Sequence, residues 1–514
     1  MTGLLSLPPE LLQAIGDDLG PAKKQLRLVC NQLSAVLEPL VLSHVVIDVT
    51  RARLPTSIDQ LQSLADEGRR SGAFVRELSI RALAPAREVI RPGGAQMMFS
   101  GGSWNAVASR RHGGNTSEAG TSLNKYLEEA ISKMENLQVV RWNPSVDDPE
   151  WSLLAVMKGL AYSKTLSYLN LYLPFGFDTS ALRFDLLHGL KRIVISGTCE
   201  FFSPFVVKRL GDCIAQSPEM NSIDVDRSLC RRDEEVPSLH CLLGNAPQRR
   251  LKHLGLHSWY TRLDSITIPH LRALKSLALL NIRDSPHDGH PFSSTAADIW
   301  SALRVNKIHL ERISTDAMDA SLIEYLASYS GLTRLYLKSI TAPDHQSSDQ
   351  LAEMFFDSAL PPHSSTLEDL YVLPRYEGKW CFGEHIAPSI VRCSRLQYLK
   401  VAVISSKVNP SADYGSGRGD VINMLISMVA RHLRAIKKLC ITTAQAESLR
   451  GFEHAGASKK HFLSANDEIA KAILNYVPEV AYQAHLPLLT ANLCKYTPEV
   501  GVDGLDARIR YRRL

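Results

Sequence analysis

The feature that most constrains this 514-residue chain is a short apolar pattern that returns many times along it. The pattern is L-x-x-L-x-L, in which Ile, Val or Met can stand for Leu, and weaker copies also occur near residues 75 and 137. From residue 137 onward, successive copies start 23 to 40 residues apart. Such a period predicts an array of similar units in place of several unrelated domains. The ten clearest copies begin at Leu166, Leu190, Met220, Leu251, Leu274, Val305, Leu332, Leu367, Leu396 and Ile436.

Helical periodicity fills the stretches between these copies. Apolar residues at positions i, i+3 and i+4 predict helices over residues 205–215, 322–329 and 421–433, among others. Each unit therefore consists of a helix, a turn and a short strand. Because so short a strand cannot bury its apolar face alone, the strands must stack in parallel. We expect an α/β fold, namely an irregular leucine-rich-repeat solenoid with a curved parallel sheet and helices on its convex side. An ordinary α/β domain is the alternative.

The first 46 residues do not follow the repeat. A helix is expected to start at Ser6 or at Pro8-Pro9, and Gly20-Pro21 should end it. A second short helix runs through Leu26, and a third should end before Pro39. Three short helices have little core of their own, so we expect them to lean on a partner or on the solenoid.

This segment resembles the F-box. The matching residues are Leu7-Pro8-x-Glu10 with Leu11-Leu12, and Leu26-Arg27-Leu28-Val29-Cys30. An F-box followed by leucine-rich repeats resembles the substrate receptors of SCF-type cullin–RING ubiquitin ligases, including many fungal ones. The resemblance implies that the segment docks on the Skp adaptor, and through it on the ligase, while the repeats bind an unidentified substrate destined for proteasomal degradation. It places these residues in or beneath the adaptor interface: Leu7, Pro8, Leu11, Leu12, Ile15 and Val29.

The segment also departs from the usual F-box at Ala22–Gln25, at Asn31-Gln32 and at Leu33. These departures favour an alternative, a leucine-rich-repeat interaction scaffold without a ligase role. A helical cap unrelated to F-boxes is a further alternative.

A candidate substrate surface follows from strand geometry. In L-x-x-L-x-L the leucines point inward, so the residues between and just after them face the concave side of the sheet. From residue 334 onward these positions carry four Lys or Arg, three Tyr and one Asp. Arg and Tyr are frequent binding hot spots, and a basic stripe suits acidic or phosphorylated peptides. The predicted substrate-binding residues are Arg334, Tyr336, Lys338, Tyr371, Tyr398 and Lys400.

Two other interpretations of this stripe remain open. Its Tyr and Lys residues are also common on sheet surfaces for packing and solubility. A nucleic-acid-binding solenoid is the third possibility, but the formal net charge of only +5 does not favour nucleic acid as a partner.

Several classes of function are disfavoured by what the sequence lacks. It contains no nucleotide-binding, zinc-protease or nucleophile-elbow motif, so we expect a non-catalytic subunit without a cofactor. The nine cysteines form no C-x-x-C pair, which indicates reduced thiols and no metal site. Without an apolar run of about 18 residues or a secretory signal, we expect a cytoplasmic or nuclear protein with no membrane partner.

The expected domain organisation has four parts. Residues 1–46 form the F-box, and residues 47–136 form a linking region with the first irregular repeat and a Gly/Ser-rich loop at 91–120. Residues 137–445 form the solenoid. Residues 446–514 form an irregular C-terminal repeat or cap and a basic tail.

Overall fold

A computed structural model describes most of the chain, which divides into two compact units, Met1–Arg249 and Arg250–Leu514. Each unit is considered by itself. The described residues are 4–66, 68, 71–84, 97–100, 103–106, 117–197, 202–227, 237–244, 246–282, 295–408, 420–451, 455–478, 486–491, 494–503 and 506–514.

The first unit begins with a small helical module. Helix α1 (Pro9–Asp18) starts directly after Pro8, and Gly20 adopts a φ of 54° just beyond its end, as the sequence predicts. Helices α2 (Lys23–Leu26) and α3 (Asn31–Leu42) complete the module, with short 3-10 turns at Leu4–Ser6 and Gly20–Ala22. The expected end of α3 before Pro39 was wrong, because α3 continues through this proline to Leu42. Packing of Leu37 in the core offsets the hydrogen bond that Pro39 cannot donate.

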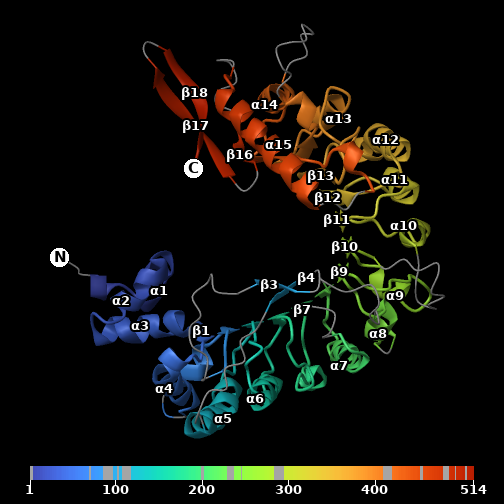
Figure 1. The fold of residues 1–514 in the computed structure, drawn as a ribbon. Coiled ribbons are helices and arrows are strands. Elements are labelled where there is room, and N and C mark those ends of the chain that lie inside the picture. Colours follow the sequence, from blue (N-terminus) through green and yellow to red (C-terminus); the bar gives the residue numbers. More distant parts are fainter. Residues whose placement is uncertain are drawn as a thin grey trace. The chain divides into compact units, whose positions relative to one another are not determined.

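The rest of the first unit is a stack of parallel strands with helices on one side (Figure 1). The strand order is β1-β2-β5-β6-β7-β8, so the stack already begins at β1, within the sequence expected to lie outside the array. The strands are β1 (His44–Ile47), β2 (Glu77–Ile80), β5 (Val139–Trp142), β6 (Tyr168–Tyr172), β7 (Arg192–Ser196) and β8 (Ser222–Asp226). The helices are α4 (Leu54–Ala65), α5 (Ser117–Ser132), α6 (Glu150–Ala161), α7 (Pro204–Ala215) and α8 (Leu239–Leu243), with 3-10 turns at Arg51–Arg53, Ser71–Phe74 and Phe184–Leu186.

The Gly/Ser-rich segment 91–120 contains regular structure where it is described. Strands β3 (Met97–Ser100) and β4 (Ser103–Ala106) pair as an antiparallel hairpin, and α5 begins at Ser117. The other residues of the predicted loop lie outside the described part of the chain.

The second unit continues the same architecture. Its parallel strands are β9 (His253–His257), β10 (Ser276–Leu280), β11 (Arg312–Thr315), β12 (Arg334–Ile340), β13 (Asp369–Pro374), β14 (Tyr398–Val403), β15 (Lys438–Thr443) and β16 (Leu488–Ala491). The helices are α9 (Ile268–Leu271), α10 (Ala296–Val305), α11 (Ala320–Ala327), α12 (His345–Met354), α13 (Ala387–Val391), α14 (Val421–His432) and α15 (Ala455–Asn475). Short turns of other helix types lie at Phe355–Ala359, Pro361–His363, Ser405–Lys407 and Glu447–Leu449.

Burial along the strands confirms the repeat. In β12 the burial alternates, so that Leu335 and Leu337 are 1% and 0% exposed while Lys338 is exposed. Neighbouring strands pair in register, and Leu335 stands between Ile313 and Leu370. The apolar residues of successive repeats therefore form one continuous row. Each buried side chain contributes about 1.5–3 kcal/mol to the stability of the fold.

One copy of the pattern was assigned to the wrong residues. The prediction put a strand around Ile308 with Val305 pointing inward, but Val305 is 75% exposed at the end of α10. The strand of this repeat is β11, and its inward residues are Ile313 and Thr315. Lys307, at a φ of 52°, turns the chain out of the helix, and the strand begins five residues later than the pattern predicts.

The carboxy-terminal residues do not form a tail. Strands β17 (Cys494–Asp503) and β18 (Asp506–Arg513) make an antiparallel hairpin beside β16. Tyr511 is buried in β18 and its hydroxyl donates a hydrogen bond of 3.0 Å to the carbonyl of Pro487. This buried aromatic residue anchors a segment whose many arginines alone suggest a solvated end. None of the helices in the described ranges has both the length and the apolar character for crossing a membrane.

Candidate functional site

The helical module presents apolar side chains to solvent. We call the exposed set Leu11, Ile15, Leu19, Leu28 and Val29 the apolar helical face; their exposed fractions are 52, 37, 41, 78 and 70%. The first three lie at i, i+4 and i+8 of the α1 segment, so they form one stripe. A small module that exposes this much apolar surface has the character of a docking site for another protein.

The six predicted adaptor-binding residues divide between this face and the core of the module. Leu12 is 2% exposed and packs with Leu33 and Leu37, and Leu7 is half-buried against the same cluster. Pro8, Leu11, Ile15 and Val29 are exposed. Leu7 and Leu12 thus hold the module together, whereas the other four are available for contact.

Gly16 allows the two long helices of the module to meet. A β-carbon at this position would lie 2.5 Å from Cδ2 of Leu37 in α3. With Gly16 and Leu12 both facing α3, the stripe of Leu11 and Ile15 is turned away from the core, which leaves it exposed.

The second candidate surface is the open face of the second unit, which we define as the side of β11–β15 formed by the outward residues of the strands. The six predicted substrate-binding residues do lie there. Tyr336 pairs with Tyr371, which pairs with Lys400, while Arg334, Asp369 and Tyr398 are aligned in the neighbouring row. The rings of Tyr336 and Tyr371 meet edge to face at 4.7 Å, and Nζ of Lys400 lies 6.0 Å from the Tyr371 ring centre.

Asp369 organises the centre of the open face. The Tyr336 hydroxyl donates to its Oδ2 at 2.7 Å, and Nε of Arg334 lies 3.4 Å from the same atom. Burial and the Asp369 carboxylate raise the pKa of Tyr336, which keeps this phenol protonated as a donor. Arg334 and Tyr336 are therefore partly satisfied within the protein and offer a partner less than their residue types suggest.

The predicted stripe ends sooner than the sequence indicates. Ala402 follows Val401, the last apolar residue of its copy, so the repeat pattern places it on the outward side like Lys400. In the structure Ala402 is 1% exposed and packs with Cys381 and Ala444. The segment after β13 runs over the carboxyl ends of β14 and β15, where Phe382 pairs with Val403 and Tyr376 pairs with Gln445.

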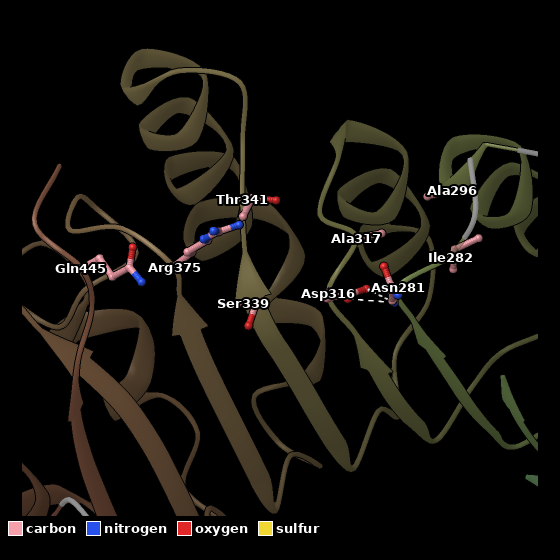
Figure 2. A pocket seen from close by; sticks show the side chains of 9 residues that line it. All are labelled: Asn281, Ile282, Ala296, Asp316, Ala317, Ser339, Thr341, Arg375 and Gln445. Atoms are coloured by element: carbon pink, nitrogen blue, oxygen red, sulfur yellow. Dashed lines mark hydrogen bonds between the residues drawn. The ribbon is translucent and has the colours of Figure 1, made fainter. Parts of the chain in front are cut away.

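A cavity of about 540 Å³ opens at the carboxyl ends of β10–β13. In Figure 2, Arg375, Thr341 and Gln445 lie together on one side, and Asp316 and Asn281 lie together on the other. Both carboxylate oxygens of Asp316 accept from the backbone N–H of Asn281, at 2.8 and 3.0 Å. Burial raises the pKa of Asp316. The remaining lining residues are Ile282, Ala296, Ala317 and Ser339.

Three cations were not among the predicted site residues. Arg312 precedes Ile313 in β11 and was missed with the strand itself, although Leu310, Ile313 and Thr315 fit the same spacing. Lys438 lies on the predicted stripe but was not selected. Arg375 follows the end of β13, where the repeat pattern makes no prediction.

His253 and His257 of β9 lie in the second compact unit, whereas Asp224 and Asp226 of β8 lie in the first. The sequence does not favour a metal site at these four residues. Across the described residues, no group of three or more His, Cys, Asp or Glu side chains is arranged to hold a metal ion.

Comparison with known proteins gives only remote similarity. No family model matches the chain, and no curated protein matches it. Among solved structures, a chain of the Rad7 and Elc1 complex from yeast is 14% identical, with a TM-score of 0.41, and the match covers 85% of this chain and 92% of that one. The leucine-rich repeat-containing protein LegL7 from Legionella pneumophila is 11% identical, with a TM-score of 0.28 and coverages of 83% and 98%. A leucine-rich-repeat protein from Leptospira interrogans is 10% identical, with a TM-score of 0.23 and coverages of 82% and 97%.

Proposed function

We propose that this chain is the substrate-recognition subunit of an SCF-type cullin–RING ubiquitin ligase. The apolar helical face would dock on the Skp adaptor, and the open face of the second unit would bind the substrate. The chain itself would perform no reaction, since its contribution is to hold a substrate near the transfer machinery.

The observation that carries this proposal is the exposure of Leu11, Ile15 and Val29 on a module with a very small core. The module buries Leu12, Leu33 and Leu37 but leaves Leu11, Ile15 and Val29 exposed. Covering the Leu11 and Val29 side chains in an interface would contribute about 1–3 kcal/mol each. Stacked repeats, for their part, present an extended surface that suits binding to another protein.

The test is capture of a purified Skp adaptor by the full chain. The variant is the double substitution Leu11→Asp and Val29→Asp, chosen because both side chains are more than half exposed and their loss leaves the module core intact. The matched control is Val305→Asp, an equally exposed apolar residue of the second unit. Leu7→Asp would be a poor choice because Leu7 packs on the core.

We expect stoichiometric capture by the wild type and by the control, and a loss of at least about 100-fold in affinity for the double variant. A folded wild-type chain that captures no adaptor would refute the ligase role. The leucine-rich-repeat scaffold without that role would then be the better account.

A further inference from the structure

The open face carries positive charges that are not held in ion pairs within the described part of the chain. Arg312, Lys338, Arg375, Lys400 and Lys438 form no ion pair with any residue in the described ranges. By contrast, Lys275 pairs with Glu311 at 2.6 Å, and Arg304 pairs with Glu324 at 2.6 Å. Cations left without carboxylate partners on one face favour an anionic partner.

Three of these cations follow a diagonal across the strands. Arg375 lies four residues beyond Tyr371 of β13, and Tyr371 is the register partner of Lys400 in β14. Lys438 of β15 aligns with Tyr398, which lies two residues before Lys400 in β14. With about 3.3 Å per residue along a strand and about 4.8 Å between strands, the path from Arg375 to Lys438 is about 22 Å long. An extended peptide of about seven residues spans this distance.

The cavity provides a deeper position at one end of this path. Arg375 is exposed and carries five N–H donors, and the Thr341 hydroxyl and Gln445 amide lie on its side of the cavity (Figure 2). A carboxylate or phosphate group placed there would receive charge-assisted hydrogen bonds from the guanidinium. The volume of the cavity, about 540 Å³, lies within the usual range of ligand-binding pockets.

The partner must also tolerate two carboxylates. Asp316 stands across the cavity from Arg375, and Asp369 lies at the centre of the face. A nucleic-acid backbone would be repelled by both carboxylates, and it has no N–H group that could donate a hydrogen bond to them. An extended peptide has backbone N–H groups that can donate to these carboxylates, while its acidic side chains reach the cations. The tyrosines add rigid contact area at a low entropic cost.

We propose that the open face binds an extended segment of a partner protein rich in anionic side chains, with one anionic group anchored at Arg375 in the cavity. The identification of this partner as the ligase substrate rests on the proposed function, but the binding chemistry does not.

The test is fluorescence anisotropy with the full chain and two labelled octapeptides. One probe is octaglutamate, and the other is a Gly/Ser peptide with a single phosphoserine. Arg375→Ala and Lys400→Ala should each weaken binding by about tenfold, while Lys158→Ala, an exposed cation of α6 in the other unit, should change it less than about twofold. Whichever probe shows this dependence on Arg375 identifies the anionic group as carboxylate or phosphate.

Binding of neither peptide, or binding unaffected by Arg375→Ala and Lys400→Ala, would overturn the proposal. Tighter binding of an octathymidine oligonucleotide than of both peptides would overturn it in favour of nucleic acid. Adaptor capture is measured on the same variants, and Arg375→Ala should retain it. If the wild-type chain binds a peptide with this dependence on Arg375 but captures no adaptor, the ligase role is refuted and this inference stands.

Discussion

Lowering the pH should destabilise the second unit through one buried histidine. His363 is 1% exposed, and both ring nitrogens have backbone partners. Nδ1 accepts a hydrogen bond of 3.3 Å from the backbone N–H of Leu332, so Nε2 carries the proton and donates to the carbonyl of Leu326 at 3.0 Å. A second proton, on Nδ1, would point at the N–H group of Leu332 and would have no hydrogen-bond acceptor in this buried position.

The size of the effect follows from the pKa. Burial lowers the pKa of His363 from 6.5 to about 4. Since the folded-state value lies below the unfolded-state value, the unfolded chain takes up the proton first as the pH falls. The stability is therefore fully present above about pH 6.5 and is lost progressively toward pH 4. Between about pH 7 and pH 5 the loss in unfolding free energy is about 2 kcal/mol.

The assay is urea unfolding of the full chain at a series of pH values. His363→Gln removes the titrating ring and keeps an amide that can donate to the Leu326 carbonyl, so this variant should be less stable at pH 7 but should lose about 2 kcal/mol less on acidification. His432→Gln, at the exposed end of α14, should keep the wild-type pH dependence. If wild type and His363→Gln lose the same stability between pH 7 and pH 5, the reasoning is refuted.

Three further outcomes are expected. Tyr325→Phe should lower the unfolding free energy by about 1–3 kcal/mol, because its buried hydroxyl donates to one backbone carbonyl and accepts from one backbone N–H; urea unfolding measures this, and equal stability of Tyr325→Phe and the exposed Tyr162→Phe would contradict it. A thiol reagent should modify the exposed Cys241 in the native protein but spare Cys213, since burial raises the pKa of Cys213 to about 12; native labelling of Cys213 detected by mass spectrometry would disprove this. Gly16→Val should separate α1 from α3, cost about 1–3 kcal/mol and expose the module to limited proteolysis, and an unchanged cleavage rate would show that the close contact is unimportant.

Much of the fold could be predicted because the repeat is a local signal. Each L-x-x-L-x-L copy specifies one strand, and the alternation in β12 or β13 then determines which side chains are buried. The predictions failed where tertiary contacts outweighed a local preference. Pro39 remains inside α3, and the arginine-rich end of the chain forms β18 because Tyr511 finds a buried position.

The candidate site likewise combines features that follow from the local pattern with features that depend on tertiary contacts. Which outward positions carry Lys, Arg and Tyr could be read from the repeat alone, because side chains alternate across a strand with a period of two. Which of these side chains remain accessible depends on contacts between residues that are distant in the sequence. Asp369 engages Arg334 and Tyr336, and the segment after β13 covers Ala402. Arg375 meets Asp316 across a cavity because strand ends far apart in the sequence share one edge of the sheet, a relation that no local pattern encodes.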